Sequence, residues 1–251
     1  MQSFLKSILG LFFLTIVHGC QPAHQKNLLI YTRNGEGFVH DNIEASVAAL
    51  QKLAKENDYQ VQVTDDPEFF TPTNLKPFDC IIFSNTNNEA FISQPQREAF
   101  KNYIESGGGF VGIHSASGSE RDWPWFWAMV GGKFVRHPAL QEFELKVIDH
   151  ENPATSFLGE TWKWEDEVYY LDHLNPDIHV LLAADLRTVE DDTKYDFHQN
   201  RFDDYTPIAW VHEYAGGRQF YTALGHKQVY YSNPEFLQHL LGGIKWVLQD
   251  N

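Results

Sequence analysis

Histidine and carboxylate side chains recur in this sequence where short apolar runs end. They are His40, His114, Glu165, Asp166, Glu167 and His226. If the apolar runs are neighbouring strands of one open sheet, loops that are far apart in sequence bring these groups into a single cleft. The set contains the side chains that move protons near neutral pH and that bind transition metals.

Two kinds of chemistry fit this set. Imidazoles with one carboxylate suit a zinc-like divalent ion that keeps an open position, with His114, His226 and His40 as ligands. The other is metal-free acid–base work, in which His114, His40 and either Glu167 or Asp166 act as the catalytic groups. The sequence has no His-x-x-x-His or Cys-x-x-Cys spacing that would decide between the two.

The segment from Gly112 to Ala116 resembles a nucleophile elbow, the sharp turn that holds a reactive side chain above a sheet. Its tip is His114, which favours acid–base or metal-binding work over covalent attack. Ser115 follows the tip residue, so it does not occupy the nucleophile position itself. It would join a Ser-His-acid triad only if another histidine reached its hydroxyl. A third alternative is that His114 has a purely structural role, with its ring nitrogens hydrogen-bonded to backbone groups.

In the first half of the chain, the elements that must position these groups alternate between strand and helix. Apolar runs predict strands, and apolar residues at helical spacing predict helices that begin near Asp41, as the N-cap, and at Gln94. The expected strands are residues 27–32, 61–63, 78–83 and 110–113. The alternation favours parallel strands with right-handed crossovers, as in a doubly wound sheet.

After about Arg136 the pattern changes to mixed strands. The expected strands are residues 143–148, 162–170 and 179–184, then a hairpin of 207–212 and 219–224, before a final helix at 234–248. The expected fold class is therefore α/β, a doubly wound sheet extended by mixed and antiparallel strands.

Charge and cysteine usage exclude several classes of partner. The 251 residues carry a net charge of −15, which repels phosphate backbones and anionic headgroups, so no nucleic acid is expected. Cys80 lies in an expected buried strand and is interpreted as a small apolar residue. If Cys20 is modified, no internal disulfide can form.

The first 19 residues resemble a lipoprotein signal peptide. Lys6 precedes a ten-residue apolar run that is too short to span a bilayer as a helix. Gly19 and Cys20 resemble a lipobox, from which His18 departs; the alternative is an ordinary signal peptide. We expect residues 1–19 to be removed, Cys20 to be lipidated in a tether of residues 20–26, and residues 27–251 to form one domain.

The expected location follows from the residues after Cys20. Gln21 is not the aspartate that signals retention at the inner membrane, and no acidic run signals surface display. We expect the periplasmic face of the outer membrane, with the lipid as the only membrane contact.

Seven short segments together resemble the ThuA-like family, which is named for trehalose utilisation. They are residues 37–41, 107–116, 122–125, 137–139, 165–169, 207–210 and 224–226. With their spacing they extend over nearly all of residues 27–249. The resemblance implies a flavodoxin-like sheet similar to class I glutamine amidotransferases, and a role in the metabolism of keto-sugars or oxidised disaccharides.

One departure from the amidotransferases is chemical. Those enzymes need a cysteine at the elbow, and this chain has His114 there, so glutamine hydrolysis through a thioester is excluded. The resemblance implies a hydrolase, lyase or isomerase acting on a sugar or glycoside, with 3-keto derivatives as candidate substrates. The alternatives are a metal-dependent hydrolase of another substrate and a non-catalytic sugar-binding lipoprotein.

Residues 122–127 contain three tryptophans in a chain that is 15% aromatic. Because aromatic faces suit the C–H faces of a pyranose ring, Trp123 and Trp125 are expected to face the cleft, with Tyr169 in its wall. The alternative is that these rings anchor the next helix. The other expected substrate-binding residues are Arg121, Ser115 and His137.

Overall fold

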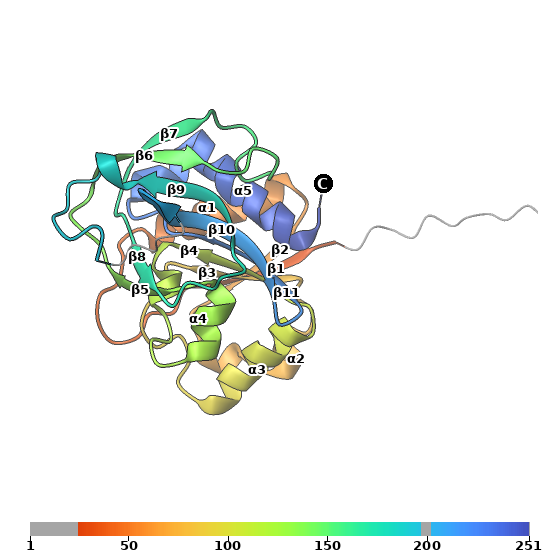
Figure 1. Cartoon of the computed structure of the whole chain (residues 1–251). Coiled ribbons are helices and arrows are strands. Elements are labelled where there is room, and N and C mark those ends of the chain that lie inside the picture. The colour runs from red at the N-terminus through yellow and green to blue at the C-terminus, as the bar shows by residue number, and fades with distance from the viewer. Residues whose placement is uncertain (1–24, 197–201, 251) are drawn as a thin grey trace, which may run out of the picture.

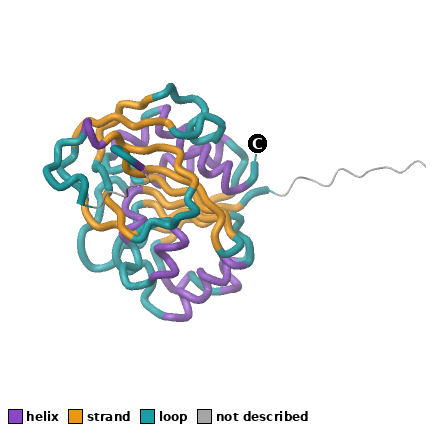
Figure 2. Tube along the Cα trace, in the orientation of Figure 1, coloured by secondary structure: helices purple, strands orange, loops and turns teal. Residues whose placement is uncertain are grey.

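A nine-stranded sheet forms the centre of the protein, with helices on both faces (Figure 1). The computed structural model describes residues 25–196 and 202–250. Figure 2 shows the strands as one layer between the helices. The helices α1 (Ile43–Glu56) and α5 (Pro234–Leu248) lie on one face, and α2 (Pro72–Leu75), α3 (Gln94–Glu105) and α4 (Pro124–Val130) lie on the other.

Five parallel strands have the order of a flavodoxin-like sheet. They are β1 (Asn27–Tyr31), β2 (Gln60–Thr64), β3 (Cys80–Ser84), β4 (Gly109–Ile113) and β11 (Gly217–Thr222), in the order β2-β1-β3-β4-β11. Tyr31 pairs with Phe83, Phe83 with Gly112, and Gly112 with Tyr221. This register brings the loops after β1, β3, β4 and β11 to the same edge of the sheet.

Antiparallel strands extend the sheet beyond β11. They are β10 (Tyr205–Tyr214), β9 (His179–Asp185), β6 (Gln141–Val147) and β7 (Thr161–Asp166), while β5 (Lys133–Arg136) and β8 (Tyr170–Asp172) form a separate pair. The β10–β11 hairpin turns at Ala215 and Gly216, both with positive φ. The predicted fold class, a flavodoxin-like sheet extended by antiparallel strands, is confirmed.

Two local predictions were wrong in ways that bear on function. The strand expected at residues 162–170 divides into β7 and β8, because side-chain burial stops alternating after Asp166 and the chain from Asp166 to Tyr170 is continuously buried. The first helix begins after Asn42 rather than Asp41. The fully buried Asn42 amide donates hydrogen bonds to Asn85 Oδ1 and to the backbone oxygens of Gly225 and His226, so it ties three loops together.

The core that holds this edge in place is rich in aromatic rings. Every residue of β3 and β4 is buried, and Phe83 lies 5.2–5.4 Å from Phe100 and Phe110 between ring centroids. Each fully buried side chain of this size stabilises the fold by about 1.5–3 kcal/mol. Cys80 is buried among them as a free thiol, and burial raises its pKa, so it is a poor nucleophile.

The N-terminal predictions cannot be compared with the fold. The expected signal peptide at residues 1–19 and the lipidated Cys20 lie outside the described residues. Within residues 25–196 and 202–250, no helix is long and apolar enough to cross a bilayer.

Candidate functional site

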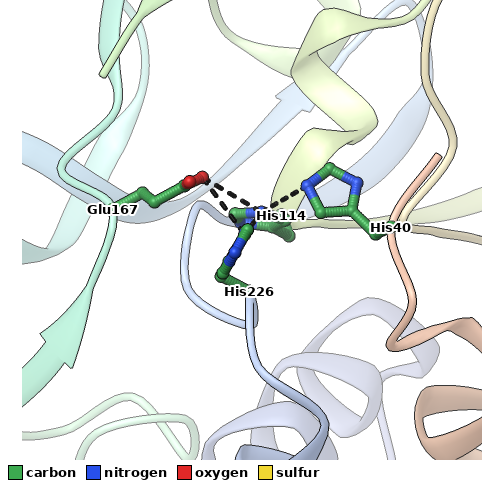
Figure 3. A group of neighbouring side chains, drawn as sticks. All are labelled: His40, His114, Glu167 and His226. Carbon is green, nitrogen blue, oxygen red and sulfur yellow. Dashed lines mark hydrogen bonds and ion pairs between the residues drawn. The ribbon is translucent and has the colours of Figure 1, made fainter. Parts of the chain in front are cut away.

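Four side chains from four loops meet at the carboxyl edge of the parallel strands. His40 follows β1, His114 follows β4, Glu167 follows β7 and His226 follows β11. One nitrogen or oxygen atom from each lies within 4.8 Å of the corresponding atom of every other. Figure 3 shows Glu167 and His40 on opposite sides of His114 and His226. We call these four residues the His–Glu cluster.

The elbow geometry predicted at His114 is present. His114 has φ 53°, a left-handed conformation that costs a non-glycine residue about 1–2 kcal/mol. Gly112 makes the turn possible, since a Cβ there would lie 2.9 Å from the Tyr221 ring and 3.4 Å from Ala116. The Tyr221 hydroxyl, 2.8 Å from the His114 carbonyl oxygen, donates to it and holds the turn.

A backbone hydrogen bond fixes the proton on His114. Its Nδ1 lies 2.7 Å from the Ala223 carbonyl oxygen, and because a carbonyl only accepts, Nδ1 carries the proton. The neutral ring therefore presents an Nε2 lone pair to the cluster. The Tyr169 hydroxyl lies 3.0 Å from that Nε2 and can donate to it.

His40 faces His114 directly. The two Nε2 atoms are 3.1 Å apart, and His40 Nδ1 lies 3.3 Å from the Ser115 hydroxyl. Burial lowers the pKa of His40 to about 4 and lowers the pKa of His114 well below its usual value, so both rings are neutral near pH 7. A second histidine thus reaches Ser115, but His40 Nε2 faces an imidazole rather than a carboxylate, which argues against a Ser-His-acid triad.

Glu167 and His226 complete the cluster. Glu167 Oε2 lies 3.3 Å from His226 Nδ1 and 3.6 Å from His114 Nε2, while Oε1 lies 3.4 Å from His137 Nδ1. The hydrogen bond with Glu167 raises the pKa of His226. Glu167 is therefore the acid of the 165–167 segment whose carboxylate reaches the histidines.

Asp166 does not point into the cluster. Its carboxylate accepts hydrogen bonds from the backbone N–H groups of Gly225, His226 and Glu167, and from the Trp164 indole. Burial raises the pKa of Asp166 to about 6 in spite of these donors. The contacts correct the prediction of Asp166 as a catalytic group and make it a positioning residue for Glu167 and His226.

A cleft of about 250 Å³ opens beside the cluster. It is lined by Phe38, His40, Asn87, Ser115, Gly118, Arg121, Phe134, His137, Glu167 and Tyr169. The expected contact residues Arg121, Ser115, Tyr169 and His137 are in this lining. Asn87 was missed by sequence reasoning, although its place just beyond β3 puts it at the same edge.

The two tryptophans expected in the cleft wall lie elsewhere. Trp123 packs near Phe91 and lines a separate pocket on the other side of Arg121, and Trp125 packs against Phe100 of α3. The prediction was wrong because α4 begins at Pro124 and turns these rings toward α3. Phe38, Phe134 and Tyr169 supply the rings of the cleft instead.

A larger hollow of about 420 Å³ lies at the opposite edge of the sheet, near Lys26, Tyr103 and Gly108. It is lined by residues that precede β1, β3 and β4 and by the end of α5, and its lining has no histidine. In an open α/β sheet ligands bind at the carboxyl ends of the strands, so the smaller cleft beside the His–Glu cluster is the candidate site.

The His–Glu cluster has the donor set of a divalent-metal site. Three imidazoles, two of them held neutral by burial, and one carboxylate are typical zinc ligands. The Ala223 carbonyl and the Ser115 hydroxyl contact the far nitrogens of His114 and His40, as outer-shell partners of metal-bound histidines do.

Comparisons with known proteins agree with this architecture. A family model described as ThuA, trehalose utilisation, matches residues 27–247. A ThuA-like protein from Bacteroides uniformis is 23% identical with a TM-score of 0.71, covering 90% of this chain and 94% of that chain. One from Parabacteroides merdae is 18% identical with a TM-score of 0.69, covering 89% and 90%.

More distant similarity includes the β-galactosidase from Bacillus circulans sp. alkalophilus, with a TM-score of 0.54 and 14% identity, over 88% of this chain and 31% of that chain. At these identities the structural likenesses show the fold alone. A search of curated proteins gave no match.

Proposed function

Since the chain belongs to the ThuA family of trehalose utilisation, we propose that the cleft beside the His–Glu cluster is the active site of an enzyme acting on a sugar or glycoside. The observation that carries the proposal is the convergence of three imidazoles and Glu167 at the wall of a small cleft. Keto-sugars suit such a site, because a carbonyl beside a base and a cation is open to elimination, isomerisation or hydrolysis.

The cluster would hold a zinc-like divalent ion through His40, His114 and His226, which leaves the neighbouring Glu167 carboxylate to act as a base. When bound, such an ion polarises a carbonyl oxygen or lowers the pKa of a water molecule. The fit rests on His114, whose Nε2 lone pair faces His40 Nε2 at 3.1 Å while Ala223 holds its other nitrogen. Neutral imidazoles are the usual nitrogen ligands of such ions, so these two rings would hold one when it is bound.

The side chains around the cluster have separate tasks in this proposal. The Tyr169 hydroxyl can donate a hydrogen bond into the cleft or to His114. Glu167 is the proton acceptor, and His137, which lies 3.4 Å from its other oxygen and is 35% exposed, exchanges the proton with solvent. Phe38 and Phe134 give the apolar walls against which a sugar ring packs.

Turnover tests this proposal. The purified protein is incubated with disaccharides and their 3-keto derivatives, with and without added zinc or manganese, and products are identified by mass spectrometry. His114→Asn removes the central imidazole, and asparagine tolerates the left-handed backbone. His173→Asn is the matched control, because His173 is an exposed histidine with φ 51° outside the cluster.

Each result has a distinct meaning. Turnover that is lost in His114→Asn and kept in His173→Asn supports an enzyme centred on His114. Sugar binding without turnover, unchanged in His114→Asn, favours the non-catalytic sugar-binding protein. Turnover that survives in His114→Asn contradicts the proposed site.

For the location we propose an envelope lipoprotein anchored through Cys20 on the periplasmic side of the outer membrane. Its support is the apolar run of residues 8–17 followed by Gly19 and Cys20. A Cys20→Ala protein should leave the membrane fraction, since lipid chains would supply the only attachment. Continued fractionation with membranes would contradict the anchor.

A further inference from the structure

Arg121 is the one lysine or arginine among the ten described residues that line the cleft. Its guanidinium lies over the Phe134 ring at 5.6 Å, and Phe134 in turn packs against Tyr169 at 4.4 Å between centroids. Because the Tyr169 hydroxyl contacts His114, this packing connects Arg121 to the His–Glu cluster through the wall of the cleft.

The Arg121 guanidinium makes few polar contacts with the described residues of the protein. Its Nη2 makes one long hydrogen bond, 3.3 Å, to Asn87 Oδ1, and its Nε is buried without a hydrogen-bond partner. Among the described residues, no aspartate or glutamate forms an ion pair with it. In a chain with a net charge of −15, a half-buried arginine without an acidic partner is unusual.

The other described arginines show the contrast. Arg97, Arg136, Arg187 and Arg218 each lie within 2.6–3.0 Å of a carboxylate oxygen. Arg33 also lacks a carboxylate partner, but it does not line the cleft. Arg121 is therefore the place where an unpaired guanidinium and the candidate active site coincide.

The loop that carries Arg121 is rigidly held. The neighbouring Glu120 is buried, pairs with Arg97 at 2.6 Å and accepts from the Phe91 amide, while its own amide donates to the Asn88 carbonyl. Gly118 leaves space for the guanidinium, since a Cβ there would lie 3.3 Å from Arg121 Nη2. Arg121 is thus positioned before any ligand arrives, which lowers the entropy cost of binding.

A fixed guanidinium with unused donors is the usual partner of a carboxylate or a phosphate. Phosphate sites gather several basic side chains or backbone amides, whereas the described lining of this cleft has one arginine and no lysine, which matches one planar carboxylate better. We propose, on the basis of the proposed function, that the substrate is a sugar acid. Its carboxylate binds Arg121, and its reacting carbon lies toward Glu167 and His114.

Calorimetry of the whole purified protein with matched ligand pairs tests this inference. The probes are hexuronates and aldonates, as free acids and as glycosides, each beside its neutral parent sugar, with glucose 6-phosphate as the phosphate probe. We expect a sugar acid to bind at least about tenfold more tightly than its neutral parent at low salt, and added salt to reduce that preference.

Variants then assign the preference to one residue. Arg121→Gln should abolish the preference, so that its affinity for the acid falls at least about tenfold more than its affinity for the neutral parent, whereas Arg121→Lys should retain part of the preference because the charge remains. Arg187→Gln is the matched control, since it removes an equal charge from an exposed arginine paired with Asp185, outside the cleft.

Several outcomes would overturn the inference. One is equal affinity of the native protein for sugar acids and their neutral parents. Another is an equal loss of affinity for the acid and for the neutral parent in Arg121→Gln, which would make Arg121 a structural residue. Tighter binding of glucose 6-phosphate than of any sugar acid would replace the carboxylate with a phosphate. If neutral sugars bind and turn over without any preference for acids, the proposed function stands and this inference alone fails.

Discussion

The Nε2 atoms of His114 and His40 lie 3.1 Å apart. The Nδ1 atom of His114 contacts the Ala223 carbonyl, and the Nδ1 atom of His40 contacts the Ser115 hydroxyl. Burial keeps both rings neutral, so the repulsion between charges that would normally separate two histidines is absent. At this distance the His114 Nε2 lone pair accepts a hydrogen bond from the Nε2–H of His40, because the His114 proton is on Nδ1. One side-chain atom each of Glu167 and His226 lies within 4.8 Å of these two nitrogens.

The first prediction is that the protein binds a divalent ion near-stoichiometrically. Elemental analysis after growth with added metals should detect it in the native protein and in His173→Asn, and not in His114→Asn. Loss of an outer-shell partner alone lowers metal affinity about 10–100-fold, so loss of His114 itself should lower it by more than about 100-fold. An absence of metal from all three proteins would leave metal-free acid–base catalysis or plain binding.

The second prediction concerns Asp166, which holds the backbone of Gly225 and His226. Asp166→Asn puts an amide donor against N–H groups, so we expect the free energy of unfolding to fall by about 1–3 kcal/mol and metal affinity to fall about 10–100-fold. Denaturant unfolding and metal titration measure these effects.

Glu165→Gln is the control for Asp166→Asn. Glu165 is the preceding acid on the same strand; it is exposed and pairs with Lys227 outside the cluster. If the two variants bind metal equally well, Asp166 does not position the site.

Much of this site could be predicted from the sequence, because strand ends in a parallel sheet are fixed by apolar runs. His40, His114 and His226 each follow such a run, and the parallel register brings them together. Which acid of the 165–167 segment faces the histidines could not be predicted, because it depends on β7 ending at Asp166 rather than continuing.

The positions of the tryptophans and of Asn42 could not be predicted from the sequence, because tertiary packing decides them. Composition indicates that aromatic rings bind sugars, but the direction in which Trp123 points is decided by how α4 packs on α3. The sequence favoured Asp41 as the helix cap, and only the tertiary structure shows that the Asn42 amide donates hydrogen bonds to the carbonyl oxygens of Gly225 and His226.

The third prediction follows from the position of Trp123. Because the ring packs on Phe91 and Phe126, Trp123→Ala should lower the free energy of unfolding by about 2–4 kcal/mol, somewhat less than truncation of a fully buried ring. Sugar affinity should stay within about twofold. Phe134→Ala, which removes a ring that lines the cleft, should instead weaken sugar binding. The reverse pattern would restore Trp123 as a sugar contact.

The last prediction uses His239, which is fully buried away from the cluster. Its Nδ1–H donates to the Ala154 carbonyl at 2.9 Å, its Nε2 lies 3.1 Å from the Thr222 hydroxyl, and burial lowers its pKa to about 4. In the unfolded chain the same group has a pKa of about 6.5. Between these two values the unfolded state binds more protons, so stability rises with pH.

The contribution of His239 to stability is therefore fully present above about pH 6.5 and is lost as the pH falls toward 4, by an amount on the order of 3 kcal/mol. His40 and His114 add to the same trend, so the measurement compares variants. In urea unfolding from pH 7 to pH 4, His239→Gln should lose less stability than the native protein. His150→Gln, at a half-exposed position, should follow the native curve. Parallel curves for His239→Gln and the native protein would show that His239 titrates normally in the folded state.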